Sequence, residues 1–276
     1  MTSTRLELLP EYRGVSVVPR ARDYLVDGER YQRVTTALGI IAKPALVGWA
    51  KRVTLEKVRE ILLDTDVSSS LLNAAYGVGE GDGPDVDYTG WVERVLATAG
   101  AAADKQRDTL AELGTEAHRL IAQASPLGST VQGQLRGFVP RELRPAYDGA
   151  LRFLSDQEIT VVDTEMVVWS PELGVAGTVD GVGWQGEKLV IWDWKRSSGM
   201  YWETALQLAA YRELLHEITG HWAERAYAVR LLREAPEEGE AWYEVKVLTL
   251  FAPAFEAYKN AVGLQRASNK KFWESA

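Results

Sequence analysis

Apolar and alternating stretches concentrate in the second half of the chain, where they predict a β-sheet packed against helices. Three stretches rich in β-branched and aromatic residues, at 160–169, 176–184 and 188–194, predict consecutive strands. Amphipathic patterns predict a helix over 145–157, before these strands, and another over 202–219, after them. Because helices precede and follow the strands, we expect a central mixed sheet with helices on both faces.

The first half of the chain is predicted to be mostly helical after an initial strand pair. Two short strands turn at Asp27-Gly28, a dipeptide that is typical of hairpins, and lead into a helix. One or two amphipathic helices follow Pro44, and a further helix is expected over 91–125. Residues 77–90 are rich in Gly and Asp and lack a core-forming pattern, so we expect a mobile loop there.

A second strand pair and a final helix are expected near the C-terminal end. The strands cover 223–232 and 241–249 and are joined by a polar turn at 236–239. The helix begins near Pro253. The chain has no internal repeat, so these elements are expected to form one elaborated α/β domain.

Composition narrows the class of protein. With 276 residues and 46% hydrophobic content, the chain is long enough to bury a full core. It has no cysteine, which excludes disulfides and thiolate metal sites and is compatible with a reducing cytoplasm. No stretch approaches the length of a membrane span, and the first residues lack the apolar core of a signal peptide. We therefore expect a cytoplasmic protein with no membrane contact.

The net charge of −8 is unevenly distributed along the chain. Residues 1–60 hold eleven Lys and Arg against seven Asp and Glu, whereas residues 61–116 hold three against eleven. The N-terminal segment is therefore the expected phosphate-contacting surface outside any catalytic centre, although such a cluster can also be a solvated face. The candidate DNA-binding residues are Arg30, Arg33, Lys43, Lys51 and Arg52.

Candidate chemistry begins with two aspartates and a lysine on the predicted neighbouring strands. Asp180 lies in TVDGVG, and Asp193 and Lys195 lie in WDWK. Two carboxylates on adjacent strands can hold a divalent cation, and a lysine two residues after one of them points to the same face. A cation beside an ammonium group suits phosphodiester hydrolysis. The alternatives are that Asp180-Gly181 forms only a turn and that Lys195 is only a salt-bridge partner of Asp193.

The helix expected after these strands carries Gln207 and Tyr211, which lie one turn apart and share a face. A tyrosine on such a face more often belongs to the core than to a catalytic site. The joint order of strand, Asp, strand, Asp-x-Lys and a helix with Gln-x-x-x-Tyr is what favours a shared catalytic role.

This order resembles the PD-(D/E)xK nuclease superfamily and, within it, the branch that contains RecB-type nuclease domains and phage exonucleases. GTVDGV is similar to the first metal-ligand strand, which implies that Asp180 is a ligand. WDWK is similar to the second motif, which implies a second ligand in Asp193 and the catalytic lysine in Lys195. QLAAY is similar to the helix motif of this branch, which implies that Gln207 and Tyr211 position the lysine or the scissile strand.

The same resemblance extends to the flanking segments. GTEAHRLI looks like the helix in which this branch places a metal-binding histidine, here His118, and VVDTEMVVWS carries Glu165 where related nucleases often have an acidic residue. The backbone carbonyl of Trp194 is the remaining implied ligand, and the implied ion is Mg²⁺ or Mn²⁺. Val179 replaces the proline of the family name, and the absence of cysteine excludes the iron–sulfur cluster of some relatives.

The resemblance implies a PD-(D/E)xK core with a central mixed sheet flanked by helices and an N-terminal helical and β-hairpin elaboration. We expect a single nuclease domain over 1–276, with the elaboration in 1–112 and the core in 113–276. The expected activity is metal-dependent DNA cleavage, by an exonuclease of phage or bacterial recombination or repair. It would act on single- or double-stranded DNA ends, with a recombination protein as a possible partner.

Two alternatives remain open. One is a restriction-type endonuclease on the same core, which would need a base-reading element. The other is a non-catalytic protein of nuclease fold that binds DNA ends or a partner protein.

Overall fold

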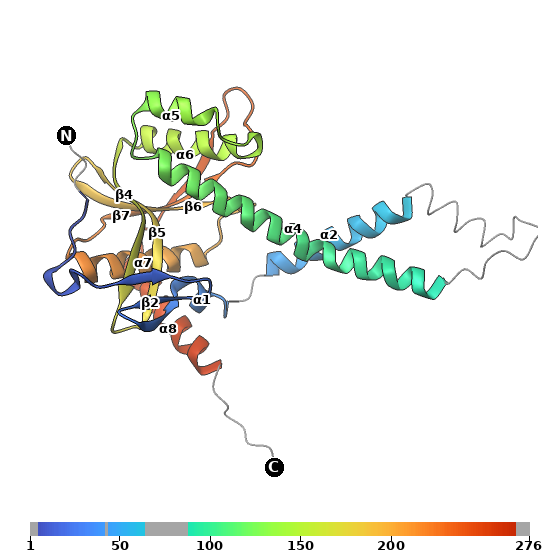
Figure 1. The fold of residues 1–276 in the computed structure, drawn as a ribbon, viewed down its shortest axis with the longest axis horizontal. Helices are drawn as coiled ribbons and strands as arrows, with labels where there is room; N and C mark the ends of the chain where they lie inside the picture. The colour runs from blue at the N-terminus through green and yellow to red at the C-terminus, as the bar shows by residue number, and fades with distance from the viewer. Residues whose placement is uncertain (1–4, 42–43, 64–87, 269–276) are drawn as a thin grey trace, which may run out of the picture. The chain divides into compact units, whose positions relative to one another are not determined.

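The computed structural model describes residues 5–41, 44–63 and 88–268 (Figure 1). The chain separates into two compact units, one formed by residues 1–41 together with 114–276, and the other by residues 42–113. The single nuclease domain expected from the sequence stays a prediction. Residues 77–87 of the expected mobile loop lie outside the described residues, while residues 88–90 begin a helix.

One mixed sheet organises the first unit. Among the described residues it has eight strands, in the order β1-β2-β3-β5-β6-β7-β8, with β4 paired to β5. The strands are β1 (Val17–Pro19), β2 (Asp23–Val26), β3 (Glu29–Arg33), β4 (Ile159–Ser170), β5 (Val175–Gln185), β6 (Lys188–Lys195), β7 (Arg225–Leu231) and β8 (Tyr243–Val247). The mixed sheet with flanking helices confirms the fold class predicted from the sequence.

Strand β5 has two different neighbours along one of its edges. Its first residues pair in parallel with β3, at Gln32↔Val175 and Arg33↔Ala176. From Gly181 onward it pairs antiparallel with β6. Among the described residues, positions 177–180 therefore have no strand partner on this edge, while β4 covers the other edge. The central strands therefore diverge at this point.

The described residues also form seven α-helices and two 3₁₀ turns. Their bounds are α1 (Val34–Leu38), α2 (Pro44–Leu63), α4 (Tyr88–Ala124), α5 (Ser129–Arg136), α6 (Arg144–Asp156), α7 (Glu203–Thr219) and α8 (Phe251–Ser268), with 3₁₀ turns η1 (Pro10–Tyr12) and η2 (Arg141–Leu143). None of the described helices combines the length and apolar character that crossing a membrane would require.

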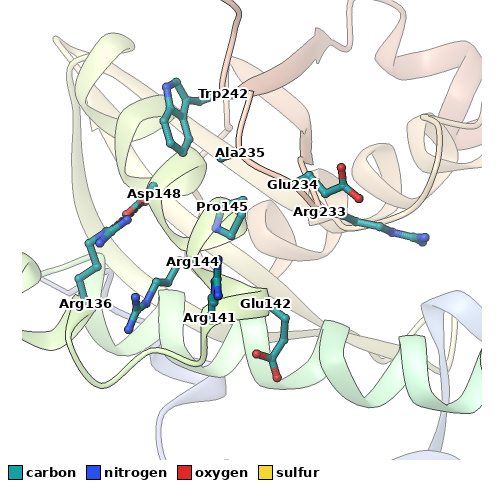
Figure 2. Close-up of a pocket in the computed structure, with 10 residues that line it drawn as sticks. All are labelled: Arg136, Arg141, Glu142, Arg144, Pro145, Asp148, Arg233, Glu234, Ala235 and Trp242. Atoms are coloured by element: carbon teal, nitrogen blue, oxygen red, sulfur yellow. Dashed lines mark hydrogen bonds and ion pairs between the residues drawn. The ribbon is translucent and has the colours of Figure 1, made fainter. Parts of the chain in front are cut away.

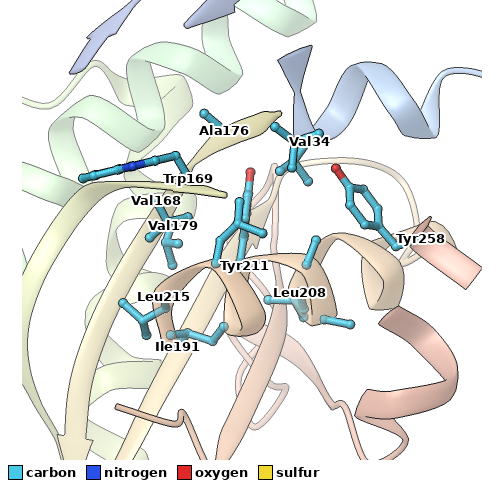
Figure 3. Packing of buried hydrophobic residues seen from close by; sticks show 14 of the residues in the cluster. Val34, Val168, Trp169, Ala176, Val179, Ile191, Leu208, Tyr211, Leu215 and Tyr258 are labelled. Atoms are coloured by element: carbon cyan, nitrogen blue, oxygen red, sulfur yellow. The ribbon is translucent and has the colours of Figure 1, made fainter. Parts of the chain in front are cut away.

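Alternation along β6 sends its side chains to two different helices. On one face, Asp193 is hydrogen-bonded to Gln207 of α7. On the other face, Trp194 packs edge-on against Phe153 of α6. The main core lies on the α7 side, where Ile191 joins apolar residues of β4, β5 and α8 (Figure 3). The carboxylate and the lysine of the Asp-x-Lys triplet therefore face α7 at the border of this core.

Two elements were not predicted from the sequence. Helix α5 is only eight residues long and carries two apolar side chains at helical spacing, the exposed Val131 and the half-buried Leu135, so its pattern is too short to predict a helix. Strand β1 is three residues long and ends in Pro19, and such a segment carries little pattern. The other strands lie within a few residues of their predicted bounds, and the stretch after Pro44 is one helix.

Asp180-Gly181 lies inside β5 and forms no turn, so the turn alternative is wrong. Gly181 is opposite Trp192, and a Cβ built at this glycine would lie 2.0 Å from the indole ring. A Cβ built at Gly177 would lie 2.5 Å from the ring of Tyr211. The glycines of the GTVDGV segment thus make room for aromatic rings that pack on the strand.

Gly181→Ala should destabilise the fold by about 1–3 kcal/mol, because the new methyl group must displace the fully buried Trp192. Urea unfolding followed by tryptophan fluorescence measures this change. Gly133→Ala in α5 is the matched control, since a Cβ there meets nothing within 4 Å and should leave stability unchanged or raise it. Equal stability of the two variants would contradict this description of β5.

Candidate functional site

The fork between β5 and β6 brings the two aspartates together. Gly181↔Trp192 is the last pair of the β5–β6 ladder, so Asp180 and Asp193 stand opposite each other one residue further along. Both side chains are buried. The backbone N–H of Trp194 donates to Oδ2 of Asp180 at 2.7 Å, which fixes that carboxylate against β6.

Lys195 is held by a hydrogen-bonded chain that runs from β6 into α7. Its Nζ lies 2.6 Å from Oδ2 of Asp193 and donates to Oε1 of Gln207 at 2.9 Å. The amide of Gln207 in turn donates to Oδ1 of Asp193 at 2.8 Å and to the Tyr211 hydroxyl at 3.1 Å. Both oxygens of Asp193 are therefore engaged, and the one-turn spacing of Gln207 and Tyr211 places the Tyr211 hydroxyl against the amide that contacts the lysine.

His118 and Glu165 complete the cluster from outside the two motif strands. Nδ1 of His118, on α4, lies 3.3 Å from Oδ1 of Asp180. One ligand atom each from His118, Glu165 and Asp180 lies within 4.8 Å of the others. Because Thr164 pairs with Gly181 and Met166 with Val179, Glu165 stands opposite Asp180 across the β4–β5 ladder. The backbone of Glu165 is in the left-handed region, with φ of 54°.

The charges in this cluster are strongly perturbed. Burial alone would lower the pKa of His118, but the carboxylates of Asp180, Asp193 and Glu165 together outweigh it and raise the pKa to about 9. Loss of solvent, together with the charge of Asp180, raises the pKa of Glu165 to about 7. Burial also raises the pKa of Asp193, to about 6, against the opposing effect of Lys195. Carboxylates crowded in this way favour a cation beside them.

The donor atoms fit a divalent metal ion. Two carboxylates and an imidazole suit Mn²⁺ and are compatible with Mg²⁺. Ligand atoms about 2.1 Å from one ion lie at most about 4.2 Å apart, so small side-chain rotations would bring His118, Glu165 and Asp180 into one coordination shell. The described residues thus offer a metal site in which Glu165 is more directly placed than Asp193.

A pocket of about 480 Å³ opens beside these ligands along the unpaired edge of β5. His118 and Glu165 line it together with residues from β2, β3 and β5. Tyr24 and Thr178, whose hydroxyls are 2.8 Å apart, were not singled out from the sequence. Tyr24 reaches the site only because β3, which pairs with β2, joins β5, and no local pattern encodes that pairing. Thr178 lies two residues before Asp180 on β5, so strand alternation could have identified it.

The predicted DNA-binding residues are dispersed. Arg33 lines the pocket beside the metal ligands, with its guanidinium over the Tyr24 ring. Arg30 is instead paired with Asp23, at 2.6 Å. The other candidates are Lys51 and Arg52, which are exposed on α2 in the second unit, and Lys43, which lies outside the described residues. Their contact with DNA, and the ligand role of the Trp194 carbonyl, stay predictions.

Comparisons with known proteins identify a protein family that this chain matches. A family model described as the PD-(D/E)XK nuclease superfamily matches residues 88–271. Among solved structures, an alkaline exonuclease of Laribacter hongkongensis (LHK-Exo) is 11% identical, with a TM-score of 0.31 over 55% of this chain and 85% of that chain. A protein named SSO0001 is 15% identical, with a TM-score of 0.27 over 57% of this chain and 77% of that chain. No curated protein matches the chain.

Proposed function

Because this chain belongs to the PD-(D/E)XK nuclease superfamily, we propose that it is a metal-dependent deoxyribonuclease, working as an exonuclease in phage or bacterial DNA recombination or repair. One observation carries the proposal. The lysine of the Asp-x-Lys triplet, its aspartate and the glutamine of α7 form a closed set of contacts beside a cluster of candidate metal ligands. Because the lysine, its aspartate and the glutamine of the motifs are all present and in contact, we favour catalysis over a role in binding alone.

In this proposal, His118, Glu165 and Asp180 would hold Mg²⁺ or Mn²⁺, with Asp193 and the Trp194 carbonyl as further ligands. A bound ion would lower the pKa of a coordinated water and offset charge on the phosphate. Asp193 also contacts Lys195, so its carboxylate would set the position of the ammonium group as well.

Lys195 acts as a cation in this scheme. Burial lowers the pKa of Lys195, but Asp193 and Asp180 outweigh it and raise the pKa above its ordinary value. The amine therefore stays protonated at neutral pH, and it orients the attacking water and stabilises phosphate charge by donating hydrogen bonds. Gln207 holds the ammonium in place, and Tyr211 holds the Gln207 amide.

The direct test compares labelled linear duplex, covalently closed circular duplex and single-stranded DNA with Mg²⁺ or Mn²⁺. An exonuclease should release short products from linear DNA and leave closed circles intact. Nicking or linearisation of closed circles would support the endonuclease alternative. No cleavage of any substrate with either metal would contradict the proposed function.

His118→Ala should weaken metal binding by about ten- to a hundred-fold and leave cleavage partly rescued by added Mn²⁺, because two carboxylate ligands remain. Calorimetric titration with Mn²⁺ and cleavage at limiting metal measure the two effects. His221→Ala is the control, since His221 is exposed and lies outside the cluster. Normal cleavage by His118→Ala at limiting metal would make His118 a structural residue.

A further inference from the structure

A second pocket, which we call the arginine pocket, lies outside the cluster of candidate metal ligands. It has a volume of about 720 Å³ and is lined by four arginines, Arg136, Arg141, Arg144 and Arg233, and by Trp242. Figure 2 shows that these side chains come from the helical segment of α5, η2 and α6 and from the connection between β7 and β8. No motif noted in the sequence includes them.

The four arginines differ in how far their charge is already compensated. Arg136 forms a two-pronged ion pair with Asp148, with both N–O distances at 2.6 Å. Arg144 uses only its Nε, which donates to the carbonyl of Val139 at 3.1 Å. The exposed Arg141 side chain makes no hydrogen bond or ion pair with any described residue. Arg141 and Arg144 thus keep guanidinium donors available for a ligand.

Arginines also crowd the other side of the pocket. Nε of Arg233 donates to the carbonyl of Arg196 at 3.2 Å, and Arg196 donates to the carbonyl of Glu142 at 3.0 Å. Nε of Arg196 is buried and has no hydrogen-bond partner among the described residues. Burial and the nearby charge of Arg233 lower the pKa of Arg196. An anion in the pocket would relieve this repulsion, which the nearby charge of Glu142 opposes without cancelling it.

The position of Arg196 links the arginine pocket to the proposed chemistry. It follows Lys195 directly in the chain, and its contacts with Arg233 and Glu142 tie the end of β6 to two walls of the pocket. A strand whose phosphate lies at Lys195 could therefore continue into the pocket within a few nucleotides. Trp242 adds a half-buried indole, with Arg152 stacked 4.6 Å from its centroid, that can contact a sugar or base.

We infer that the arginine pocket binds backbone phosphates of the nucleic-acid strand whose scissile phosphate lies at Lys195. The inference rests on the proposed nuclease function and adds a strand path to it. Guanidinium groups match phosphate oxygens with paired hydrogen bonds, and a row of phosphates can contact several arginines at once. An acidic peptide could also pair with the arginines, but its binding would not explain why the pocket adjoins Lys195.

The test is Arg141→Ala, because this side chain has no hydrogen bond or ion pair with a described residue to lose. Binding of a labelled single-stranded oligonucleotide, measured by fluorescence anisotropy without divalent metal over a series of salt concentrations, should be about five-fold weaker near 0.1 M salt. The slope of log affinity against log salt should become shallower by about 0.7, which corresponds to one lost phosphate contact. Arg141→Lys keeps the charge and should keep most of the slope.

The control is Lys188→Ala, which removes one exposed positive charge at the opposite end of β6 and should leave the slope unchanged. Equal slopes for Arg141→Ala, Lys188→Ala and wild type would overturn the inference. So would displacement of the oligonucleotide by polyglutamate as readily as by unlabelled DNA.

Hydrolysis of bis(p-nitrophenyl) phosphate separates this inference from the proposed function, because so small a phosphodiester cannot span both sites. Arg141→Ala should hydrolyse it at the wild-type rate with Mn²⁺ while losing affinity for DNA. If the wild type hydrolyses this compound and Arg141→Ala does not weaken DNA binding, the inference is wrong but the proposed function stands. An altered salt slope in a protein that cleaves neither substrate would overturn only the nuclease proposal.

Discussion

Lys195→Ala should lower the single-turnover cleavage rate by at least 10²-fold, which corresponds to about 2.7 kcal/mol of transition-state stabilisation. The variant removes the only ammonium group that contacts Asp193 and Gln207 among the described residues. DNA binding should change little, since one phosphate-facing charge is lost from a larger surface. Single-turnover cleavage at saturating enzyme separates the chemical step from binding.

The same substitution also leaves the buried carboxylate of Asp193 without its ion partner, and breaking such a pair costs about 3–5 kcal/mol of stability. A melting curve must therefore accompany the kinetics. Lys195→Gln is the better-matched variant, because its amide can still donate to Asp193 while carrying no charge. If folded Lys195→Gln cleaves at the wild-type rate, Lys195 is only a partner of Asp193 and the proposed mechanism fails.

Asp180→Asn should abolish measurable metal binding and cleavage together. The substitution removes one negative charge from the cluster with His118 and Glu165, and an amide oxygen is a much weaker ligand than a carboxylate. The asparagine oxygen can still accept the Trp194 N–H, so the link to β6 should survive. Calorimetric Mn²⁺ titration and a cleavage time course measure the two losses.

Asp23→Asn serves as the control for Asp180→Asn. Asp23 is equally buried and is paired with Arg20 and Arg30, but it lies outside the metal-ligand cluster. The Asp23→Asn variant should be less stable than the wild type but should bind Mn²⁺ with the same affinity. Wild-type Mn²⁺ binding by Asp180→Asn would remove Asp180 from the metal site.

The sequence was most informative where function depends on local spacing. Alternation within one strand places Asp193 and Lys195 on one face, and one helical turn places Gln207 beside Tyr211. The hydrophobic runs that flank these residues locate the strands and the helix. The order of the strands and the helix along the chain was then enough to predict that Gln207 lies near Lys195.

Residues that reach the site through tertiary pairing were harder to predict. Glu165 meets Asp180 because of the β4–β5 register, which shifts at an irregularity between Val161 and Asp163. Thr178 meets Tyr24 because β3 joins β5. The arginine pocket takes Arg136 from α5, a helix of eight residues whose two apolar side chains make too short a pattern to predict it. These features depend on contacts between segments that are far apart in the chain, and no local sequence pattern predicts such contacts.

The left-handed backbone of Glu165 has a consequence for engineering this chain. A non-glycine residue at φ of 54° inside a strand costs on the order of 1 kcal/mol, which glycine would largely relieve. A search for heat-resistant variants that scored stability alone would therefore select against the glutamate and discard a carboxylate of the cluster. Stability and the proposed metal binding thus favour different residues at position 165, so stabilising libraries should hold it fixed.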